Sequence, residues 1–581
     1  MSGSNGAPAQ PVAADKPGQG AAQRLRLLLP GRADYADLRR TWRGDVVAGV
    51  TVGVVALPLA LAFGITSGLG ADAGLITAIV AGLVAGVFGG SNVQVSGPTG
   101  AMTVVLVPIV ARQGVEAVFL VGLLAGLVIL AAGLAGFGRF LAFIPWPVIE
   151  GFTLGIAVII FLQQVPAALG VPKPHGENTA VVAARAVIDA IDSAGLWWAI
   201  ALVALVVAIM VVGPRLHRGM PVSLLGVVAA TLVARLADLD VAVIGELPNS
   251  LPAPSLPTFS MTLASDLSGA VLAVAALGAL ESLLSAKVAD GMAGVGRHDA
   301  NRELIGQGLA NIASPLFGGM PATGAIARTA VNVKAGARTR VAAIVHALVL
   351  LGVVLAGSGL VAEIPLAALA GVLMVTAFRM VDVHNVRAVV RATRSDAIVL
   401  AVTALITVAF DLILAVEVGM AAAAVLALRH LARTSTMIAE PLPLIDSDTA
   451  ASLHHDHIIS YRLDGALFFG AVQRFLHELT AVDNVEVVIL RFPDLQMLDA
   501  TGAQALGETI DDLQGRGITV LIKGPRSQHL RILREVGVID RLADPKHVFT
   551  DLDAAIAHAH SHVKRRHDRH AGIGSDGVSN A

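Results

Sequence analysis

Long apolar runs constrain this chain more than any other feature of its sequence. A helix needs about 20 predominantly apolar residues to cross the ~30 Å of hydrocarbon in a bilayer. By that measure the first set of predicted spans lies near residues 44–66, 72–90, 94–111, 115–137, 145–165, 196–213 and 220–238. A second set is predicted near residues 266–288, 301–317, 321–336, 339–361, 365–381, 395–412 and 413–432. The pattern predicts an all-α polytopic membrane domain of about fourteen spans, occupying residues 44–436.

The composition favours a chain that lies in lipid. Only 14% of the 581 residues are charged and 55% are hydrophobic, with a mean hydropathy of +0.74, whereas soluble chains usually carry about 25% charged residues. The net charge of −2 gives no reason to expect a nucleic-acid partner, and the absence of cysteine excludes disulfides and thiolate metal sites. No G-x-x-x-x-G-K-[ST] sequence occurs, so ATP hydrolysis is not expected. If the chain moves a solute, that transport must therefore run on gradients, and we expect no cofactor, no metal and no enzymatic activity.

The distribution of Lys and Arg predicts how the chain is threaded. Short cytoplasmic loops carry an excess of both residues. Most of the Lys and Arg residues next to the predicted spans lie before the first span and in alternate loops: Arg39, Arg40, Arg43, Arg139, Arg215, Arg218, Arg297, Arg302, Lys334, Arg338, Arg340, Arg379, Arg387, Arg391, Arg394, Arg429 and Arg433. The intervening loops hold only Arg112, Lys173, Arg185 and Arg235. This alternation predicts an even number of crossings of the plasma membrane, with residues 1–43 and the C-terminal end in the cytoplasm.

A repeat is visible inside the membrane part. Phe-Gly-Gly ends the second span of each half, at residues 88–90 and 317–319. In each half a short span interrupted by Gly, Pro and Thr follows, beginning with residues 91–100 and 320–328. An odd number of spans in each half makes the two halves inverted copies, so we predict a seven-plus-seven inverted repeat. Interrupted helices at matching positions of such a repeat indicate a transporter binding site.

The composition changes to that of a soluble domain near the C-terminal end. β-rich runs at Ile458–Leu463, Val485–Phe492 and Ile518–Ile522 alternate with helical patterns, which predicts a small α/β fold. The helical patterns are Ala471–Thr480, Gly502–Gln514, Ser527–Glu535 and Leu552–His560. We place a linker at residues 437–456, the domain at 457–562 and a disordered tail at 563–581.

The two interrupted spans predict an anion site. Irregular backbone at membrane depth leaves N–H and C=O groups that lipid cannot satisfy, so it persists where it is buried or lines a cavity. Each half-helix would present free N–H groups and the positive end of its dipole near the midplane, where both attract an anion. The alternative is a pair of kinks that only improve helix packing.

Four side chains of the predicted membrane domain are further candidates. Arg328 lies early in the second half-helix, where a guanidinium at membrane depth needs a partner or a task, although it could also snorkel to the interface. Thr99 begins the first half-helix and can donate to an anion or act as an ordinary cap. Phe63 could line the site or simply pack. His346, alone in a long apolar span, favours hydrogen-bonded packing over a proton relay.

Glu281 is the candidate for ion coupling. It lies in the middle of the span near residues 266–288, and intramembrane carboxylates commonly serve proton or cation coupling. The competing interpretation is a structural ion pair with Arg328 or Lys287. We predict proton-coupled uptake that rises as external pH falls.

Several tracts resemble the SulP family of anion transporters. They are G-L-A-N-I at 308–312, F-G-G at 317–319, A-T-G-A-I-A-R-T at 322–329, S-G-P-T-G at 96–100 and I-P-x-P-V-I-x-G-F at 144–152. L-D-A-T-G at 498–502 resembles the STAS domain that follows the transporter domain in that family. The resemblance implies a homodimer with a mobile core of spans 1–4 and 8–11, a gate of spans 5–7 and 12–14, and elevator-like movement of the core.

The resemblance also implies a binding site between the half-helices of spans 3 and 10. Carried onto this chain, that site comprises Phe63, Thr99, Gly100, Ala325, Ile326, Ala327 and Arg328. The bacterial bicarbonate carriers that this chain resembles include Na⁺-coupled members, which hold sodium with an Asp and a Thr on span 8 and a Thr on span 10. The matching positions here are Glu281, Ser285 and Ile326. One hydroxyl ligand is lost, which favours H⁺ over Na⁺.

The predicted function is secondary active transport of sulfate, bicarbonate or a dicarboxylate, by proton symport or anion exchange. A Na⁺-coupled bicarbonate symporter, a passive anion channel, a nucleobase permease of the same fold and a membrane receptor remain alternatives. Arg328 and the STAS-like domain disfavour the nucleobase permease. The sequence does not identify the anion.

Two features of the C-terminal part give further expectations. Thr501 lies where stand-alone STAS proteins, which this domain resembles, accept a phosphate on Ser or Thr, so it is a candidate regulatory site; the alternative is an ordinary helix cap. The histidine-rich segment is expected to be disordered, dispensable and without a metal; its members are His558, His560, His562, His567 and His570.

Overall fold

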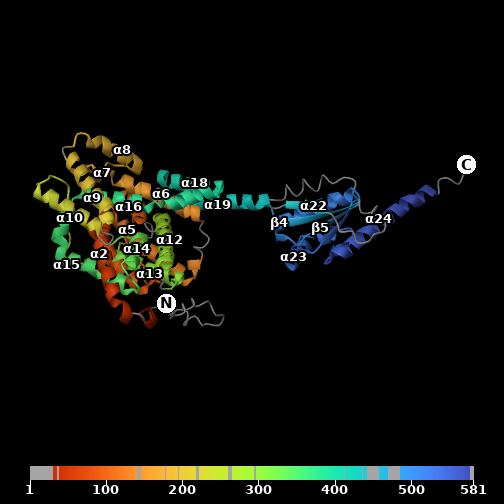
Figure 1. Ribbon diagram of the computed structural model, residues 1–581, viewed down its shortest axis with the longest axis horizontal. Helices are drawn as coiled ribbons and strands as arrows, with labels where there is room; N and C mark the ends of the chain where they lie inside the picture. The colour runs from red at the N-terminus through yellow and green to blue at the C-terminus, as the bar shows by residue number, and fades with distance from the viewer. Residues whose placement is uncertain are drawn as a thin grey trace. The chain divides into compact units, whose positions relative to one another are not determined.

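The computed structural model describes residues 30–35, 38–139, 145–176, 178–193, 195–216, 221–258, 265–293, 296–410, 412–434, 436–440, 457–468 and 485–575. The chain forms two compact units, Met1–Ala421 and Ala422–Ala581 (Figure 1). Much of the predicted linker 437–456, the predicted helix Ala471–Thr480 and the last six residues lie outside the described residues.

The first unit is helical, and each of the predicted spans has a helical counterpart in the structure. Among the described residues, 8 helices are long and apolar enough to cross a membrane, while α4 and α10 are apolar but shorter. The helices of this unit are α2 (Leu38–Ser67), α3 (Ala71–Phe88), α4 (Gly100–Gln113), α5 (Val115–Leu134), α6 (Trp146–Gln163), α7 (Val165–Ala168), α8 (Thr179–Ala190), α9 (Leu196–Leu216), α10 (Val222–Leu236), α12 (Ser268–Ala293), α13 (Ala300–Leu316), α14 (Ile326–Lys334), α15 (Val341–Ala362), α16 (Leu366–Met380), α17 (Val383–Ala392), α18 (Arg394–Ala409) and α19 (Leu412–Thr434). The apolar runs did not predict α7, α8 and α17.

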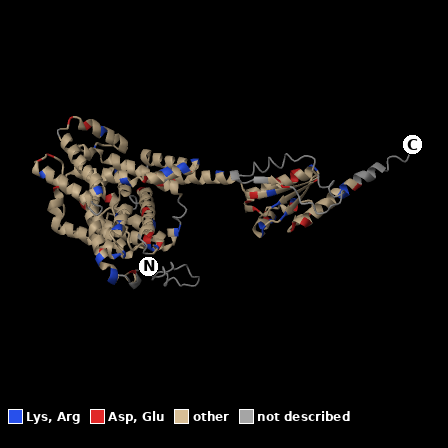
Figure 2. Cartoon of the chain, viewed as in Figure 1, with Lys and Arg blue, Asp and Glu red and all other residues tan. Residues whose placement is uncertain are grey.

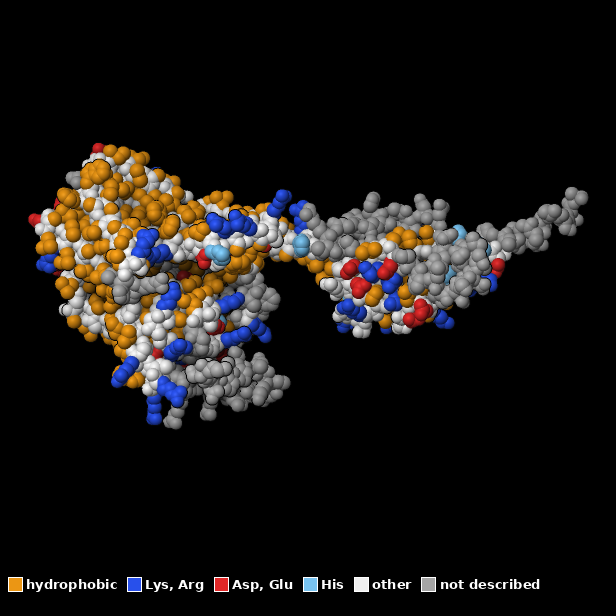
Figure 3. All heavy atoms as spheres, viewed as in Figure 1, with side chains coloured by type: hydrophobic (Ala, Val, Ile, Leu, Met, Phe, Trp, Pro, Cys, Tyr) orange, Lys and Arg blue, Asp and Glu red, His pale blue; other side chains and the backbone are white. Residues whose placement is uncertain are grey.

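The surface of this unit fits a lipid environment. Figure 2 shows few charged side chains along its helices, whereas the second unit carries both signs. On the face drawn in Figure 3, apolar side chains cover most of the first unit. Trp197 and Trp198, at the start of α9, are 75% and 52% exposed, which suits aromatic rings at the edge of a bilayer.

Small residues allow the helices to approach closely. A Cβ on Gly126 of α5 would lie 2.7 Å from the backbone nitrogen of Ile312 in α13, and one on Gly308 would lie 2.6 Å from that of Leu130. Helices in lipid associate through such contacts because burial of apolar surface drives them together only weakly. The Gly-rich composition of the spans therefore has a direct packing role.

Two arginines that were assigned to loops are buried. Arg302 lies in the first turn of α13 and donates two hydrogen bonds to the carboxylate of Asp34, at 2.9 and 2.7 Å. Arg340, which precedes α15, lies 3.5 Å from the same carboxylate and donates to the carbonyl of Gly89. Burial alone would raise the pKa of Asp34, but hydrogen bonds from Arg302 and the N–H of Gly31, with the charges of both arginines, lower it. These arginines hold the segment before α2 against the helices, because charged groups at such depth need a partner.

Each interrupted span is a two-residue strand followed by a short helix. β1 (Ser96–Gly97) precedes α4, and β2 (Thr323–Gly324) precedes α14. The strands pair antiparallel, with Ser96 opposite Gly324 and Gly97 opposite Thr323. Segments far apart in the sequence therefore meet where both helices begin.

The second unit is an α/β sheet with helices on both faces. Its strand order is β3-β4-β5-β7-β8, with β6 paired to β4, and only the β3–β4 pair is antiparallel. The predicted strands and three of the predicted helices are confirmed. The elements are β3 (Thr436–Ala439), β4 (Ile458–Leu467), β5 (Val487–Arg491), β6 (Leu495–Leu498), α22 (Ala500–Gly515), β7 (Thr519–Lys523), α23 (Ser527–Glu535), β8 (Val548–Phe549) and α24 (Leu552–Ser575).

The prediction of a disordered histidine-rich tail is wrong for the segment that α24 contains. The helix covers the face of the sheet opposite α22 and α23, through the fully buried Ala555, Ile556, Ala559 and Val563. These residues form an apolar stripe at helical spacing, which the many histidines between them obscure. The predicted domain end at residue 562 therefore falls inside a helix that packs on the core.

Candidate functional site

The starts of α4 and α14 lie side by side, because β1 and β2 pair directly before them. Thr99 caps α4, and its hydroxyl accepts from the N–H of Met102 at 3.4 Å. Ala325 precedes α14 without a side-chain cap. Both helices thus direct first-turn N–H groups and the positive ends of their dipoles to one place.

Glu281 of α12 lies at this place with two hydroxyls on its carboxylate. The hydroxyls of Thr99 and Thr323 donate to its Oε2 at 2.9 and 2.8 Å, and they lie 3.1 Å from each other. Sequence reasoning missed Thr323. The signal was present, since Thr323 lies in the second interrupted tract as Thr99 lies in the first.

Arg328 is the third residue of α14, and its side chain is only 2% exposed. Nη2 donates to the carbonyl of Pro98, just before α4, while Nη1 is buried without a hydrogen-bond partner among the described residues. Snorkelling to an interface is therefore wrong for this side chain. Nη1 of Arg328 can therefore donate a hydrogen bond to a bound acceptor.

Glu281 and Arg328 attract one another electrostatically, but within the described part of the chain no ion pair joins Glu281 to Arg328 or Lys287. The carboxylate is held by hydroxyls and the guanidinium by a backbone carbonyl. The structure therefore leaves the carboxylate of Glu281 and the guanidinium of Arg328 near each other without a direct hydrogen bond between them. That arrangement can respond to an added anion or cation.

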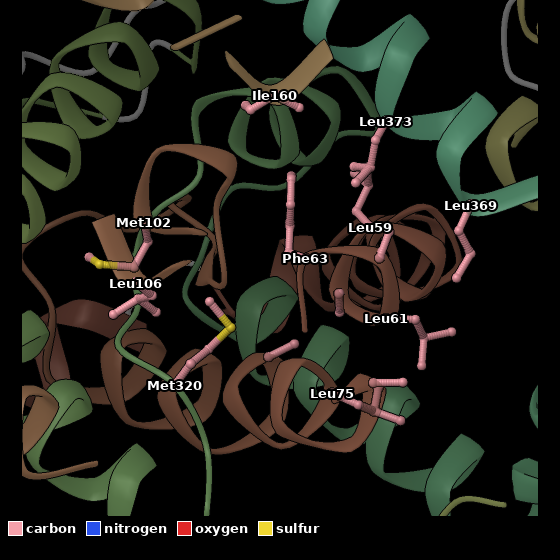
Figure 4. Close-up of a cluster of buried hydrophobic side chains, with 14 of the residues drawn as sticks. Leu59, Leu61, Phe63, Leu75, Met102, Leu106, Ile160, Met320, Leu369 and Leu373 are labelled. Carbon is pink, nitrogen blue, oxygen red and sulfur yellow. The ribbon is translucent and has the colours of Figure 1, made fainter. Parts of the chain in front are cut away.

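Phe63 of α2 and Ile160 of α6 form an apolar wall beside the start of α4. Figure 4 shows Phe63 pointing toward Ile160. A Cβ on Gly100 would lie 2.2 Å from Cδ1 of Ile160 and 3.2 Å from Cε1 of Phe63. Glycine at position 100 therefore lets the helix start approach this wall.

The start of α14 is accessible. Ala327 is exposed, Ile326 and Glu281 are half-buried, and Ala325 is buried at 6% exposure. The described helices therefore do not cover the first turn of α14 completely.

Two predicted residues have other surroundings. Within the described structure no hydrogen bond joins the side chains of Ser285 and Glu281. Instead Oγ of Ser285 lies 3.2 Å from Oγ1 of Thr329, which accepts from the N–H of Val95 at 3.1 Å. His346 is fully buried, and in the described structure neither ring nitrogen has a hydrogen-bond partner, contrary to the expectation of hydrogen-bonded packing. Ser285 thus supports the junction of β1 with α14.

Polar side chains of α13 hold both interrupted spans in place, and sequence reasoning missed them. Glu303 accepts from the N–H groups of Gly90 and Ser91 at 2.8 and 3.1 Å. Gln307 donates to Oγ of Ser96 at 2.6 Å. Asn311 exchanges two hydrogen bonds with the backbone of residue 322, at 2.8 and 2.9 Å. Buried polar groups with satisfied partners fix a backbone that could not form regular ladders.

Thr501 of the second unit is an exposed residue in the first turn of α22. The cap of this helix is Asp499, which accepts from the N–H of Gly502 at 2.7 Å. The alternative of Thr501 as the cap is therefore wrong. Its hydroxyl is free of that structural role.

Comparison with known proteins places the chain in a family. The profile of the "Sulfate permease family" matches residues 42–403, and that of the "STAS domain" matches residues 450–555. The chain is 35% identical to the Bacillus subtilis protein named "Putative sulfate transporter YvdB", over 80% of this chain and 88% of that protein. It is 31% identical to the bicarbonate transporter BicA of Synechocystis, over 81% and 86%.

A solved structure shares the fold. The murine Solute Carrier 26 family member A9 anion transporter superposes with a TM-score of 0.80 at 17% identity, covering 94% of this chain and 96% of that one. The family profiles, the relatives and the apolar helices agree. The chain belongs to the sulfate permease family, carries a C-terminal STAS domain, and is a multi-pass membrane transporter and not an enzyme.

Proposed function

We propose that this protein is a secondary active transporter of a small anion, namely sulfate, bicarbonate or a dicarboxylate. The observation that carries the proposal is the unpartnered Nη1 of Arg328 between two helix N-termini. A buried guanidinium with a free donor binds an oxyanion through charge-assisted hydrogen bonds. The relatives named for sulfate and bicarbonate transport support this class of substrate.

The proposed movement is that of an elevator, in a homodimer of the plasma membrane with both termini in the cytoplasm. Its support is the grouping of the helices. Helices α2 to α5 pack with α12 to α15, while α6, α9, α10, α16 and α18 pack mostly among themselves. The interrupted spans belong to the first group, and Ile160 belongs to the second. A shift between the groups would move the anion site, together with Phe63, past Ile160.

Proton coupling through Glu281 is the proposed drive. A low-dielectric surrounding disfavours a charged carboxylate, and a nearby anion disfavours it further. An anion held at the starts of α4 and α14 would therefore favour binding of a proton to Glu281. The two would cross together, and uptake would rise as external pH falls.

Na⁺ coupling is the second candidate, and Thr323 favours it. Sodium is a hard cation, and hard cations take oxygen ligands; the carboxylate of Glu281 and the hydroxyls of Thr99 and Thr323 supply them. The hydroxyl of Thr323 can replace the one that a threonine at position 326 would have supplied. The same three side chains thus serve either ion, and only an experiment separates the two.

Uptake of radiolabelled sulfate into proteoliposomes tests the proposal. An inward proton gradient at constant Na⁺, and an inward Na⁺ gradient at constant pH, are imposed in separate experiments, with bicarbonate, fumarate and uracil as competitors. Concentrative uptake under the first gradient alone supports the proton symporter. Concentrative uptake under the second alone supports Na⁺. Downhill flux that neither gradient concentrates indicates a channel, and uptake of radiolabelled uracil without uptake of sulfate indicates a nucleobase permease.

Alternating access has its own test because the chain contains no cysteine. Ala327→Cys places the single thiol at the exposed start of α14. A carrier should allow an impermeant thiol reagent to label this residue from either side of the membrane, more slowly when substrate is present. Labelling from one side only, with full transport activity, would contradict alternating access at this position.

A further inference from the structure

Helix α24 brings two histidines to one edge of the sheet in the second unit. Its buried face packs on β4, β5 and β7 through Ala555, Ile556, Ala559 and Val563. His558 and His562 lie one turn apart beside that face, and both are half-buried. Residues four apart lie above one another on a helix, so the two rings share one side of α24.

A third histidine meets them from the sheet. His547 directly precedes the edge strand β8, and it is only 3% exposed. Its backbone is fixed, because its N–H donates to the carbonyl of Asp544 at 3.0 Å and its carbonyl accepts from the N–H of Ile522 at 2.8 Å. The centre of its ring lies 5.2 Å from that of His558 and 5.3 Å from that of His562.

The three imidazoles present nitrogens at the spacing of metal ligands. One ring nitrogen from each lies within 4.8 Å of the other two, and the Nε2 atoms of His558 and His562 are 3.2 Å apart. In a tetrahedral site with Zn–N distances of about 2.0–2.1 Å, ligand nitrogens lie about 3.3 Å apart. The rings therefore need only a small adjustment to surround one ion.

Hydrogen bonding does not account for the whole cluster. The facing nitrogens of His558 and His562 can share a proton, but Nδ1 of His547 is buried and has no hydrogen-bond partner among the described residues. A buried polar atom without a partner is costly. A metal ion accepts lone pairs from imidazole nitrogens, and it would supply the partner that Nδ1 of His547 lacks.

We propose that His547, His558 and His562 bind one divalent transition-metal ion, of which Zn²⁺ is the type, and so join α24 to the β8 edge of the sheet. Imidazole suits Zn²⁺, Cu²⁺ and Ni²⁺, and three neutral histidines with an open fourth position form a common zinc site. The exposed carboxylate of Asp544 attracts His547 and His558 electrostatically. This proposal departs from the expectation that the histidine-rich segment binds no metal.

Bound metal should stabilise the attachment of α24. An ion that binds the folded arrangement and not the unfolded chain adds its binding free energy to the stability of the fold. The helix would then be held by its apolar stripe and by the ion together. Removal of the ion should loosen α24 without unfolding the rest of the sheet.

The test uses the full chain in detergent, purified without a polyhistidine tag and stripped of metal with a chelator. Zn²⁺ affinity and stoichiometry are measured by competition with a chromophoric chelator, and Co²⁺ reports tetrahedral coordination through its visible absorption. The expected result is one tight ion per chain. His547→Ala and His562→Ala should each weaken binding by more than about tenfold, whereas the matched control His560→Ala, on the same helix, should bind as the unaltered chain does.

A second measurement distinguishes the loss of a metal ligand from the loss of the folded structure. Metal-free His562→Gln should show the same thermal unfolding as the metal-free unaltered chain, and Zn²⁺ should raise the unfolding temperature of the unaltered chain alone. The proposal is overturned if the unaltered chain takes up no Zn²⁺ at micromolar free ion. It is equally overturned if the His547 and His562 variants retain the affinity and stoichiometry of the unaltered chain.

Discussion

Arg328 and Glu281 carry opposite charges and lie near each other where the two interrupted spans meet. In the described structure they do not form an ion pair. A carbonyl holds one nitrogen of the guanidinium and two hydroxyls hold the carboxylate. Isolated charges at membrane depth are expensive, so each must be balanced by helix dipoles, by hydrogen bonds or by a ligand. A site of this kind gains most when an anion and a cation arrive together.

Arg328→Gln should weaken anion binding, because the neutral amide replaces the charged donor between the two helix starts. A hydrogen bond to a charged group contributes about 1.5–3 kcal/mol, so the KM for sulfate should rise roughly 10- to 100-fold. Sulfate uptake into proteoliposomes measures it, with Arg297→Gln, at an exposed arginine outside the site, as the control. Unchanged affinity and unchanged preference between sulfate and bicarbonate would refute the assignment.

Glu281→Gln should separate exchange from accumulation. The amide keeps the shape of the protonated acid, and it can still meet the hydroxyls of Thr99 and Thr323, but it cannot release a proton. Exchange of sulfate across the membrane should therefore persist while pH-driven accumulation disappears. Counterflow and gradient-driven uptake are measured on the same vesicles. Accumulation that still follows the proton gradient would place the coupling group elsewhere.

At the scale of elements, α13 connects the two halves of the repeat. Its polar side chains hold β1 and β2, and its glycines let α5 approach within backbone contact. Regular helices could not supply these hydrogen bonds, because the interrupted spans offer free backbone groups only at their breaks. The two helix starts at the proposed anion site are thus held by hydrogen bonds from a third helix, α13.

Gly126→Ala should destabilise the first unit, because the added Cβ would lie 2.7 Å from the backbone nitrogen of Ile312. Overpacking of this kind costs about 1–3 kcal/mol. The matched control is Gly352→Ala on α15, where no atom lies within 4 Å of the added Cβ. Heating in detergent followed by size-exclusion chromatography measures both. Equal midpoints of thermal unfolding for the two variants would show that α5 and α13 can move apart without loss of stability.

The helices were predictable from sequence because their apolar runs have the length that a bilayer requires. The β1–β2 pairing was not, since two-residue strands carry no periodic signal and their partners lie more than 200 residues apart. Thr323 and Glu303 were missed for the same reason. Only the tertiary fold shows that one hydroxyl meets Glu281 and that one carboxylate holds Gly90. In α24, frequent histidines hid an apolar stripe.

At the scale of the whole molecule, one chain combines a lipid-facing transporter unit with an α/β unit of ordinary soluble character. The residues of the proposed anion site belong to the first unit, and the exposed Thr501 belongs to the second. We therefore predict that a change at Thr501 alters the rate of transport and not the affinity for the anion. Rate and affinity should respond separately.

Thr501→Glu tests that separation. A phosphate on Thr501 would add about −1.5 to −2 charges beside Asp499 in the first turn of α22, where the helix dipole favours negative charge and the neighbouring carboxylate opposes it. The glutamate imitates part of that charge, so the maximal rate of sulfate uptake should change while its KM stays the same. Thr501→Gln, which matches the glutamate in size without its charge, should transport at the original rate. A shift in KM at constant maximal rate would contradict regulation through the second unit.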